Sequence, residues 1–84
     1  MWKREAFFDF GKVLLNLEDY SGAVEAFEAS LDIEEGHDKI KDSEKLRFRG
    51  IAKQKAGQNG YKKDIKDAAE LGDKEAKKML KAIA

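Results

Sequence analysis

The side chains best suited to chemistry in this chain lie close together near its middle. His37 is the only histidine, and the acids Glu34, Glu35 and Asp38 are its near neighbours in the sequence. A histidine beside carboxylates can act as a base or hold a divalent cation, but metal sites usually need three or four converging ligands. These acids have the composition of a polar helix end. We therefore expect His37 to be an exposed loop residue, and we expect no metal site.

Other arrangements that could support catalysis are incomplete. The adjacent acids at 18–19 and 34–35 have no apolar surroundings that would separate the roles of two carboxylates. The glycines of Gly57-x-x-Gly60 are not followed by the Lys-Ser/Thr pair of a phosphate-binding loop. The chain has no cysteine, which excludes disulfides and thiolate metal sites. We therefore expect a protein without enzymatic activity and without a cofactor.

The length and composition are those of one small helical domain. The 84 residues are enough for a single domain with a modest core, and we place it over residues 1–84. The chain has no proline, and good helix formers dominate it. No run of about 20 apolar residues is present, so we expect no membrane span. Phe7 and Phe8 are followed at once by Asp9, unlike the apolar region of a signal peptide, so we expect a cytoplasmic location.

Charge is divided unevenly along the chain, although the formal net charge is zero. Residues 1–37 carry 3 bases and 9 acids, a net of −6, and residues 38–84 carry 14 bases and 8 acids, a net of +6. Such asymmetry is found in nucleic-acid-binding arms and in partner-facing surfaces. Solvated helix faces also produce it, and opposite halves can attract each other or a second copy of the chain.

Four lysines near the end of the chain could neutralise the phosphate groups of a nucleic acid. Three acids lie among or beside them, and no aromatic residue is available there for stacking on bases. We therefore expect a solvated helix face, and nucleic-acid association through residues 39–81 is the weaker alternative. The lysines are Lys74, Lys77, Lys78 and Lys81, and the acids are Glu70, Asp73 and Glu75.

Hydrophobic periodicity predicts five helices separated by short turns. We expect Ser21 to cap the second helix, Gly36 to follow its end, and Asp38 or Asp42-Ser43 to cap the third. A turn is predicted at Gly57-Gln58-Asn59-Gly60, and Gly72 and Asp73 should separate the fourth helix from the fifth. The predicted helices cover about 3–17, 22–34, 61–71 and 74–83, and a third helix, which begins after one of the two alternative caps, ends at about 56.

Two apolar stripes run along the first predicted helix. Phe7, Phe10, Leu14 and Leu17 form one stripe, and Phe8 and Leu15 form a second on a neighbouring face. Gly11 lies inside this helix, where glycine costs about 1 kcal/mol relative to alanine. We therefore expect the second helix to approach closely at Gly11, with Ala23 and Phe27 packed against it.

The first two helices resemble a tetratricopeptide repeat (TPR). The pattern of that family has a large residue, two spacers, Leu-Gly, two spacers, Tyr, and then Ala-x-x-x-Phe. Six positions of this chain have the expected spacing, and Tyr20 and Ser30-Leu31 complete the two-helix stretch. The six are Phe7, Phe10, Gly11, Leu14, Ala23 and Phe27.

The second copy of the pattern is degenerate. Gly50 is 39 residues after Gly11, whereas the family period is about 34. Leu46 and Ile51 keep part of the pattern, while Arg49 and Lys53 replace apolar residues. The run Ala68-Ala69-Glu70-Leu71-Gly72-Asp73 is similar to the end of a repeat in many short bacterial repeat proteins, and the last helix is similar to a capping helix.

The resemblance implies an all-α domain with a tetratricopeptide-like right-handed α-α superhelix. Hairpin one would cover about 3–35, hairpin two about 39–71 and the capping helix about 73–84. Such repeats are binding scaffolds or adaptors for proteins and peptides. The first helix of each pair lines a concave groove, which would here contain Glu5, Phe8, Lys12, Leu15 and Asn16 from the first helix and Glu44, Arg47, Ile51, Gln54 and Lys55 from the third.

The expected ligand of this groove is a peptide with an apolar anchor and an acid. Phe8 and Leu15 would take the apolar side chain, and the bases would take the carboxylate. Phe8 and Lys12 stand where the family members that bind heat-shock chaperones have a lysine and an asparagine, which argues against that ligand. Alternatively, Phe8 and Leu15 belong to the core. The alternative in another class is a self-associating structural module, which would pair two copies as a homodimer.

Overall fold

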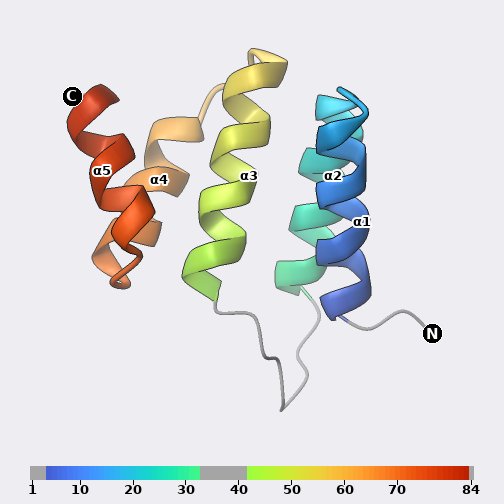
Figure 1. Cartoon of the computed structure of the whole chain (residues 1–84), viewed down its shortest axis with the longest axis horizontal. Helices are drawn as coiled ribbons and strands as arrows, with labels where there is room; N and C mark the ends of the chain where they lie inside the picture. Colours follow the sequence, from blue (N-terminus) through green and yellow to red (C-terminus); the bar gives the residue numbers. More distant parts are fainter. Residues whose placement is uncertain (1–3, 33–41, 84) are drawn as a thin grey trace.

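The computed structural model describes residues 4–32 and 42–83, and all of its regular structure over these ranges is α-helix. This confirms the predicted all-α class. Figure 1 shows the helices as a row, with the first and the last helix at its opposite ends. The five helices are α1 (Arg4–Asn16), α2 (Tyr20–Asp32), α3 (Asp42–Ala56), α4 (Tyr61–Glu70) and α5 (Lys74–Ile83).

Each helix packs mainly on the helix that follows it in the chain. α1 packs on α2, α2 on α3, α3 on α4, and α4 on α5, whereas α1 and α3 touch only lightly. The row is elongated, with principal extents of 39 × 27 × 18 Å. Below, α1 and α2 are called the first hairpin, and α3 and α4 the second hairpin (Figure 1). No helix in the described ranges is both long and apolar enough to cross a membrane.

Side-chain caps determine where α2 and α5 begin. The cap predicted at Ser21 is wrong, because Asp19 fills that role: its carboxylate accepts a hydrogen bond from the Gly22 N–H at 3.1 Å. The cap predicted at Asp73 is confirmed, since its Oδ1 accepts from the Ala76 N–H at 2.8 Å. A side-chain oxygen at this position satisfies an N–H group that has no partner within the helix. The caps predicted at Gly36 and Asp38, and the loop histidine His37, lie outside the described residues.

The first helix of each hairpin ends with the same backbone turn. After α3, the Gly57 N–H donates to Gln54 and the next N–H donates to the carbonyl of Lys53, with Gly57 at a φ of +72°. After α1, Glu18 occupies the matching place at a φ of +64°, and its N–H donates to the carbonyl of Leu15. This left-handed conformation suits glycine and strains other residues. The backbone therefore repeats between the hairpins even where the residue type does not.

In each hairpin, a glycine on the first helix lets a large side chain of the second helix approach closely. A Cβ added to Gly11 would lie 2.6 Å from the ring of Phe27, and one added to Gly50 would lie 2.7 Å from Ile65. The predicted close approach at Gly11 is therefore confirmed, and it recurs in the second hairpin. Any larger side chain at these two positions would force the helices apart.

The core consists of two clusters along the row. In the first, the rings of Phe8, Phe27 and Phe48 meet, with centroid separations of 5.3–5.8 Å. Ala23, Val24 and Ala52 are buried around these rings. The second cluster joins α4 to α5, with Leu46 of α3 beside it, and its members are Ile65, Ala68, Ala69 and Ala76 with the partly buried Met79, Leu80 and Ile83.

The apolar stripes of α1 lie on opposite sides of its contact with α2. Phe8 and Leu15 belong to the core stripe that meets α3. Phe10 is 50% exposed and Leu17 is 71% exposed, although they share the other stripe with Leu14. α1 therefore buries the stripe that was expected to line a groove, and leaves much of the other stripe in contact with solvent.

Candidate functional site

The apolar anchor of the groove predicted on α1 and α3 lies in the core. Phe8 is 1% exposed, and its ring centroid is 5.5 Å from that of Phe27 and 5.3 Å from that of Phe48. Leu15 is partly buried against the same cluster. The expectation that Phe8 is open to a ligand is wrong, because α3 places Phe48 over it. The alternative that Phe8 is a core residue is confirmed.

The bases of the predicted groove interact with residues of the chain itself. Lys12 Nζ is 5.1 Å from the centre of the Phe8 ring, and the Arg47 guanidinium is 4.8 Å from that of Phe48. Aromatic faces attract cations at such distances. Arg47 also forms an ion pair with Asp73, with an N–O distance of 3.1 Å. Because Asp73 caps α5, Arg47 joins α3 to the last helix.

The remaining groove residues are polar or only partly exposed. Binding at this surface stays a prediction, but it has lost Phe8 as its apolar anchor. Glu44 and Ile51 are partly buried, Asn16, Gln54 and Lys55 are exposed, and the side chain of Glu5 lies outside the described part of the structure. Lys55 Nζ is 5.7 Å from the ring of Tyr20, at the start of α2.

A different hollow opens between α1 and α2, and we call it the outer groove. It has a volume of about 370 Å³, and its walls are mostly apolar. Its lining does not include Phe8 or Leu15 of the core stripe, whereas Leu14 both lines the hollow and packs against the first cluster. The outer groove is lined by Phe7, Phe10 and Leu14 from α1, by Gly22, Glu25, Ala26 and Ala29 from α2, and by Asp19 from the turn.

The shape of the outer groove follows from residue size on the two helices. α1 contributes large side chains at a spacing of three and four residues, which places them on one helix face. α2 contributes Gly22, Ala26 and Ala29, which are small and share one face at a spacing of four and three residues. The result is a wall of large apolar groups beside a floor of small ones. Phe10 is half exposed at its edge.

Two acidic side chains line the outer groove. Asp19 and Glu25 line it directly, and both are exposed. Asp9 and Glu18 are also exposed on the same hairpin. Lys12 is the only base in residues 6–31, and it lies over Phe8 in the other stripe of α1. The groove therefore presents an apolar surface with a negatively charged border.

The matching face of the second hairpin is closed by ion pairs. When Gly11 is matched to Gly50, Phe10 corresponds to Arg49 and Leu14 to Lys53. When Phe27 is matched to Ile65, Ala26 corresponds to Asp64. Arg49 makes two hydrogen bonds to the Asp64 carboxylate, at 2.8 and 2.9 Å. Lys53 Nζ is 3.2 Å from the same carboxylate, which is 4% exposed.

Sequence reasoning missed the outer groove, although a signal was present. The signal is that Arg49 and Lys53 depart from the repeat pattern at places where the first hairpin has the apolar residues Phe10 and Leu14. On α1, one apolar stripe lies on each side of Gly11, where α2 makes contact. Only one of these two stripes can face α3. The stripe of Phe10 and Leu14 is the one that forms the groove wall.

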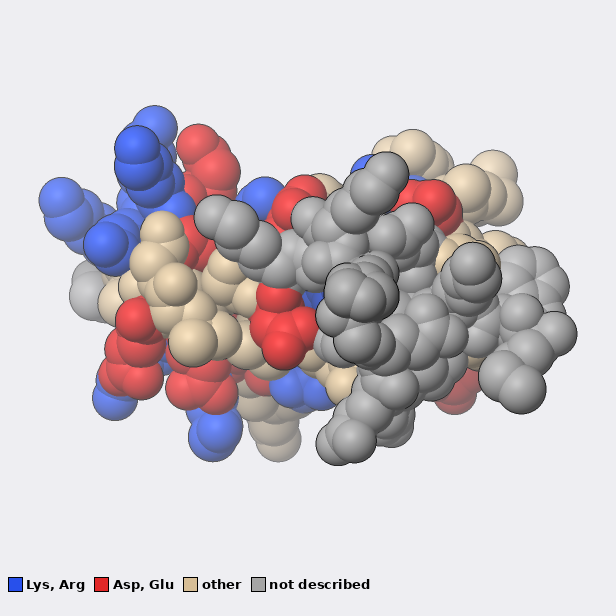
Figure 2. Space-filling model, turned by 90° about the horizontal axis from the view of Figure 1, so that it is seen from below, with Lys and Arg blue, Asp and Glu red and all other residues tan. Residues whose placement is uncertain are grey.

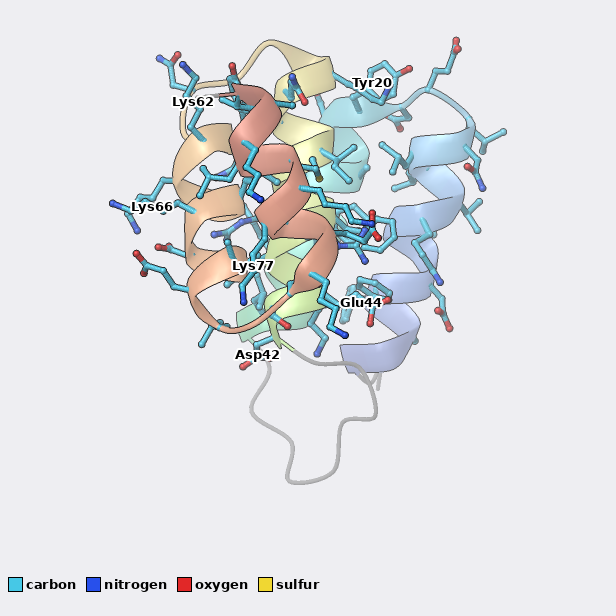
Figure 3. All side chains as sticks on the ribbon, turned by 60° about the vertical axis from the view of Figure 1, so that its left-hand side comes forward. Tyr20, Asp42, Glu44, Lys62, Lys66 and Lys77 are labelled. Carbon is cyan, nitrogen blue, oxygen red and sulfur yellow. The ribbon has the colours of Figure 1, made fainter. Side chains whose placement is uncertain are left out.

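The lysine-rich surface lies at the other end of the molecule. Lysine side chains extend from the end formed by α4 and α5, with acidic side chains among them (Figure 2). Lys62 and Lys66 point away from α4, and Lys77 lies on α5 (Figure 3). Two other lysines of these helices pair with acids on their own helix, Lys63 with Asp67 and Lys78 with Glu75. Positive charge on this surface is thus partly offset.

A second hollow, of about 360 Å³, lies between the start of α3 and the turn before α5. Glu44 and Asp73 offset the charges of Arg47 and Lys74 there, and Leu71 is exposed at its edge. Asp73 already accepts hydrogen bonds from Arg47 and from the backbone of α5, so these two charged groups of the hollow serve structural contacts. In residues 4–32 and 42–83, no three potential metal ligands lie together.

Comparison of the chain with protein-family models, with curated proteins and with solved structures finds no significant match in any of the three.

Proposed function

We propose that this chain is a non-enzymatic protein-binding module of the tetratricopeptide type. Two features support the proposal. The glycine contact of the first hairpin recurs in the second, at Gly11 with Phe27 and at Gly50 with Ile65. The last helix buries Ala76 and leaves its lysines exposed, as a capping helix does.

We further propose that the outer groove is the binding surface of the module. The observation that carries this proposal is the difference between the hairpins at one face. The second hairpin closes that face with Arg49, Lys53 and Asp64, while the first leaves Phe10 half exposed beside a hollow. The helix contact itself does not require an apolar face there. Exposed apolar surface rimmed by polar groups is typical of a contact site.

The groove fits a short helical segment. Its lining runs from Phe7 to Leu14 on α1 and from Gly22 to Ala29 on α2, and seven helical steps span about 10 Å. A helix laid in a groove makes contact through residues three and four positions apart, so about two turns of a partner would fill this length. A contact of this size is suited to transient binding.

Self-association through the outer groove is disfavoured by charge. Two copies that met face to face would bring Glu25 and Asp19 of one copy near the same acids of the other. Like charges placed opposite each other across an interface oppose binding. A partner from another protein is therefore favoured over a homodimer.

Site-specific photo-crosslinking in the source cell tests the proposed surface. A photoreactive residue at position 10 should link the chain to a discrete partner, and one at the exposed position 66 on α4 should not. With that partner purified, Phe10→Asp should weaken binding at least about tenfold, because interface anchors carry most of the binding energy. Leu71→Asp is the matched control, since Leu71 is another exposed large apolar residue, 62% exposed against 50% for Phe10, and lies far along the row.

Two results would contradict the proposal. One is the same crosslinked product from positions 10 and 66. The other is a purified partner whose affinity falls as much with Leu71→Asp as with Phe10→Asp. Circular dichroism of both variants should match the parent chain, since neither side chain is buried.

A further inference from the structure

We infer that the occupant of the outer groove is a basic amphipathic helix. The inference rests on the proposed function and adds the chemistry of the partner to it. Residues 6–31 carry five acids and one base, a net of −4. Among these, Asp19 and Glu25 line the groove itself, Asp19 from the turn before α2 and Glu25 from α2. A partner helix with lysine or arginine flanking its apolar stripe would place those bases over these acids.

The position of Lys12 strengthens the electrostatic argument. Lys12 could offset the acids of this hairpin, but it lies 5.1 Å from the centre of the Phe8 ring, in the core stripe of α1. The groove is lined by no base at all among the described residues. Among the described residues, the charged groups that line the groove are therefore Asp19 and Glu25. Complementary charge of this kind selects partners and speeds their encounter.

The groove also limits the size and the spacing of the apolar side chains that a partner can place in it. Gly22, Ala26 and Ala29 form a floor without protruding side chains, which allows another helix to approach closely. Phe10 and Leu14 stand beside this floor and can pack against one or two medium-sized apolar side chains. A stripe of leucines or alanines spaced three and four residues apart fits this surface, while a strand would place only alternate residues on it.

The molecule already contains a helix of this class at its other end. α5 buries Ala76, packs Met79, Leu80 and Ile83 against the second cluster, and leaves Lys74, Lys77, Lys78 and Lys81 exposed. The face of the second hairpin that α5 covers does not correspond to the outer groove of the first hairpin. α5 nevertheless shows that a basic amphipathic helix can close an apolar face of this fold.

Three synthetic peptides of about 18 residues, long enough to form helix, provide the test. All three carry the same leucine and alanine stripe, and the flanking positions are lysine in one, glutamine in the second and glutamate in the third. Binding to the full chain is measured by calorimetry. We expect the lysine peptide to bind about tenfold more tightly than the glutamine peptide, and the glutamate peptide to bind most weakly. Raising NaCl to about 0.5 M should reduce these differences, because salt screens exposed charges.

Matched variants separate the charge argument from the groove itself. Glu25→Lys should remove most of the difference in affinity between the lysine and glutamate peptides, because it replaces one of the two acids that line the groove with a base. Lys66→Glu, on the exposed side of α4, should leave that difference unchanged. Phe10→Ala should weaken all three peptides about tenfold, because it removes an anchor that they share. Leu71→Ala should weaken none of them.

Each result distinguishes the inference from the proposed function. Equal affinity of the three peptides, with loss on Phe10→Ala, would overturn the basic partner and leave the groove as a helix-binding surface. Binding that is insensitive to Phe10→Ala, or no binding of any peptide, would overturn both. A dimer of the free chain in sedimentation that Phe10→Ala dissociates would identify a second copy as the occupant and overturn the inference.

Discussion

The two helices of each hairpin pack on each other in the same way, but the faces beside this contact carry different residues in the two hairpins. In each, a glycine on the first helix receives a large side chain from the second, Phe27 on Gly11 and Ile65 on Gly50. In each, the first helix ends in a left-handed residue, Glu18 or Gly57. These shared features give the two hairpins the same helix contact and the same backbone turn. They show which parts of the pattern the helix packing needs.

The hairpins differ on the face that flanks the glycine. In the second, Arg49 and Lys53 hold the buried carboxylate of Asp64. In the first, Phe10 and Leu14 face a floor that includes Ala26, and the hollow between them stays open. A polar face and an apolar face are thus both compatible with the same helix contact. The apolar face of the first hairpin therefore calls for an explanation other than folding, and binding provides one.

The largest expected effect comes from breaking what the hairpins share. Gly11→Leu should destabilise the chain by about 3 kcal/mol, because its Cβ alone would lie 2.6 Å from the Phe27 ring. Urea unfolding followed by circular dichroism measures this loss. Val13→Leu, on the exposed side of the same helix, is the control and should change stability little. Equal stability of Gly11→Leu and the parent chain would refute the close approach of α1 and α2.

The next effect comes from the ion pairs that close the second hairpin. Asp64→Ala should cost about 2 kcal/mol, because it leaves Arg49 and Lys53 partly buried without their shared carboxylate. Adding Arg49→Phe and Lys53→Leu gives the second hairpin the residues of the first. We expect this triple variant to recover most of the lost stability, since well-packed apolar residues can replace a buried ion pair at little cost. Thermal unfolding of both variants checks this, and a triple variant less stable than Asp64→Ala would show that the face of the second hairpin must be polar.

A smaller effect should separate the two helix caps. Asp73→Ala removes both the cap of α5 and the ion pair with Arg47, and should cost about 1.5 kcal/mol. Asp19→Ala removes only the exposed cap of α2, and should cost about 0.5–1 kcal/mol. Urea titrations of the two variants measure the difference. If Asp19→Ala is the more damaging change, the Arg47 pair contributes nothing to holding α5.

The smallest expected effects are at the turns that end α1 and α3. Glu18→Gly should stabilise the chain by about 0.5–1 kcal/mol, because glycine adopts the left-handed conformation without a Cβ clash. Gly57→Glu should destabilise it by a similar amount, because the same strain is introduced at the second hairpin. Differential scanning calorimetry can detect shifts of this size. Effects of the same sign at both positions would contradict the equivalence of the two turns.

Local signals in the sequence determined most of the helix boundaries. The turn at residues 57–60, the stop at Gly72 and the cap at Asp73 are all confirmed, because each depends on the preference of one residue type for one local conformation. The close contact at Gly11 was also predictable, since a glycine inside a helix needs a compensating reason. The cap of α2 was misplaced by two residues, because Asp19 and Ser21 are both suitable cap types.

Only the tertiary structure decided which apolar stripe of α1 is buried. Phe8 and Phe10 lie on the two sides of Gly11, and both are equally apolar, so periodicity cannot rank them. The choice is made by α3, whose Phe48 closes over Phe8 and leaves Phe10 outside. The pairing of Arg49 with Asp64 and of Arg47 with Asp73 was equally out of reach. Contacts between distant residues depend on how helices are placed in space, and a local pattern carries no information about that placement.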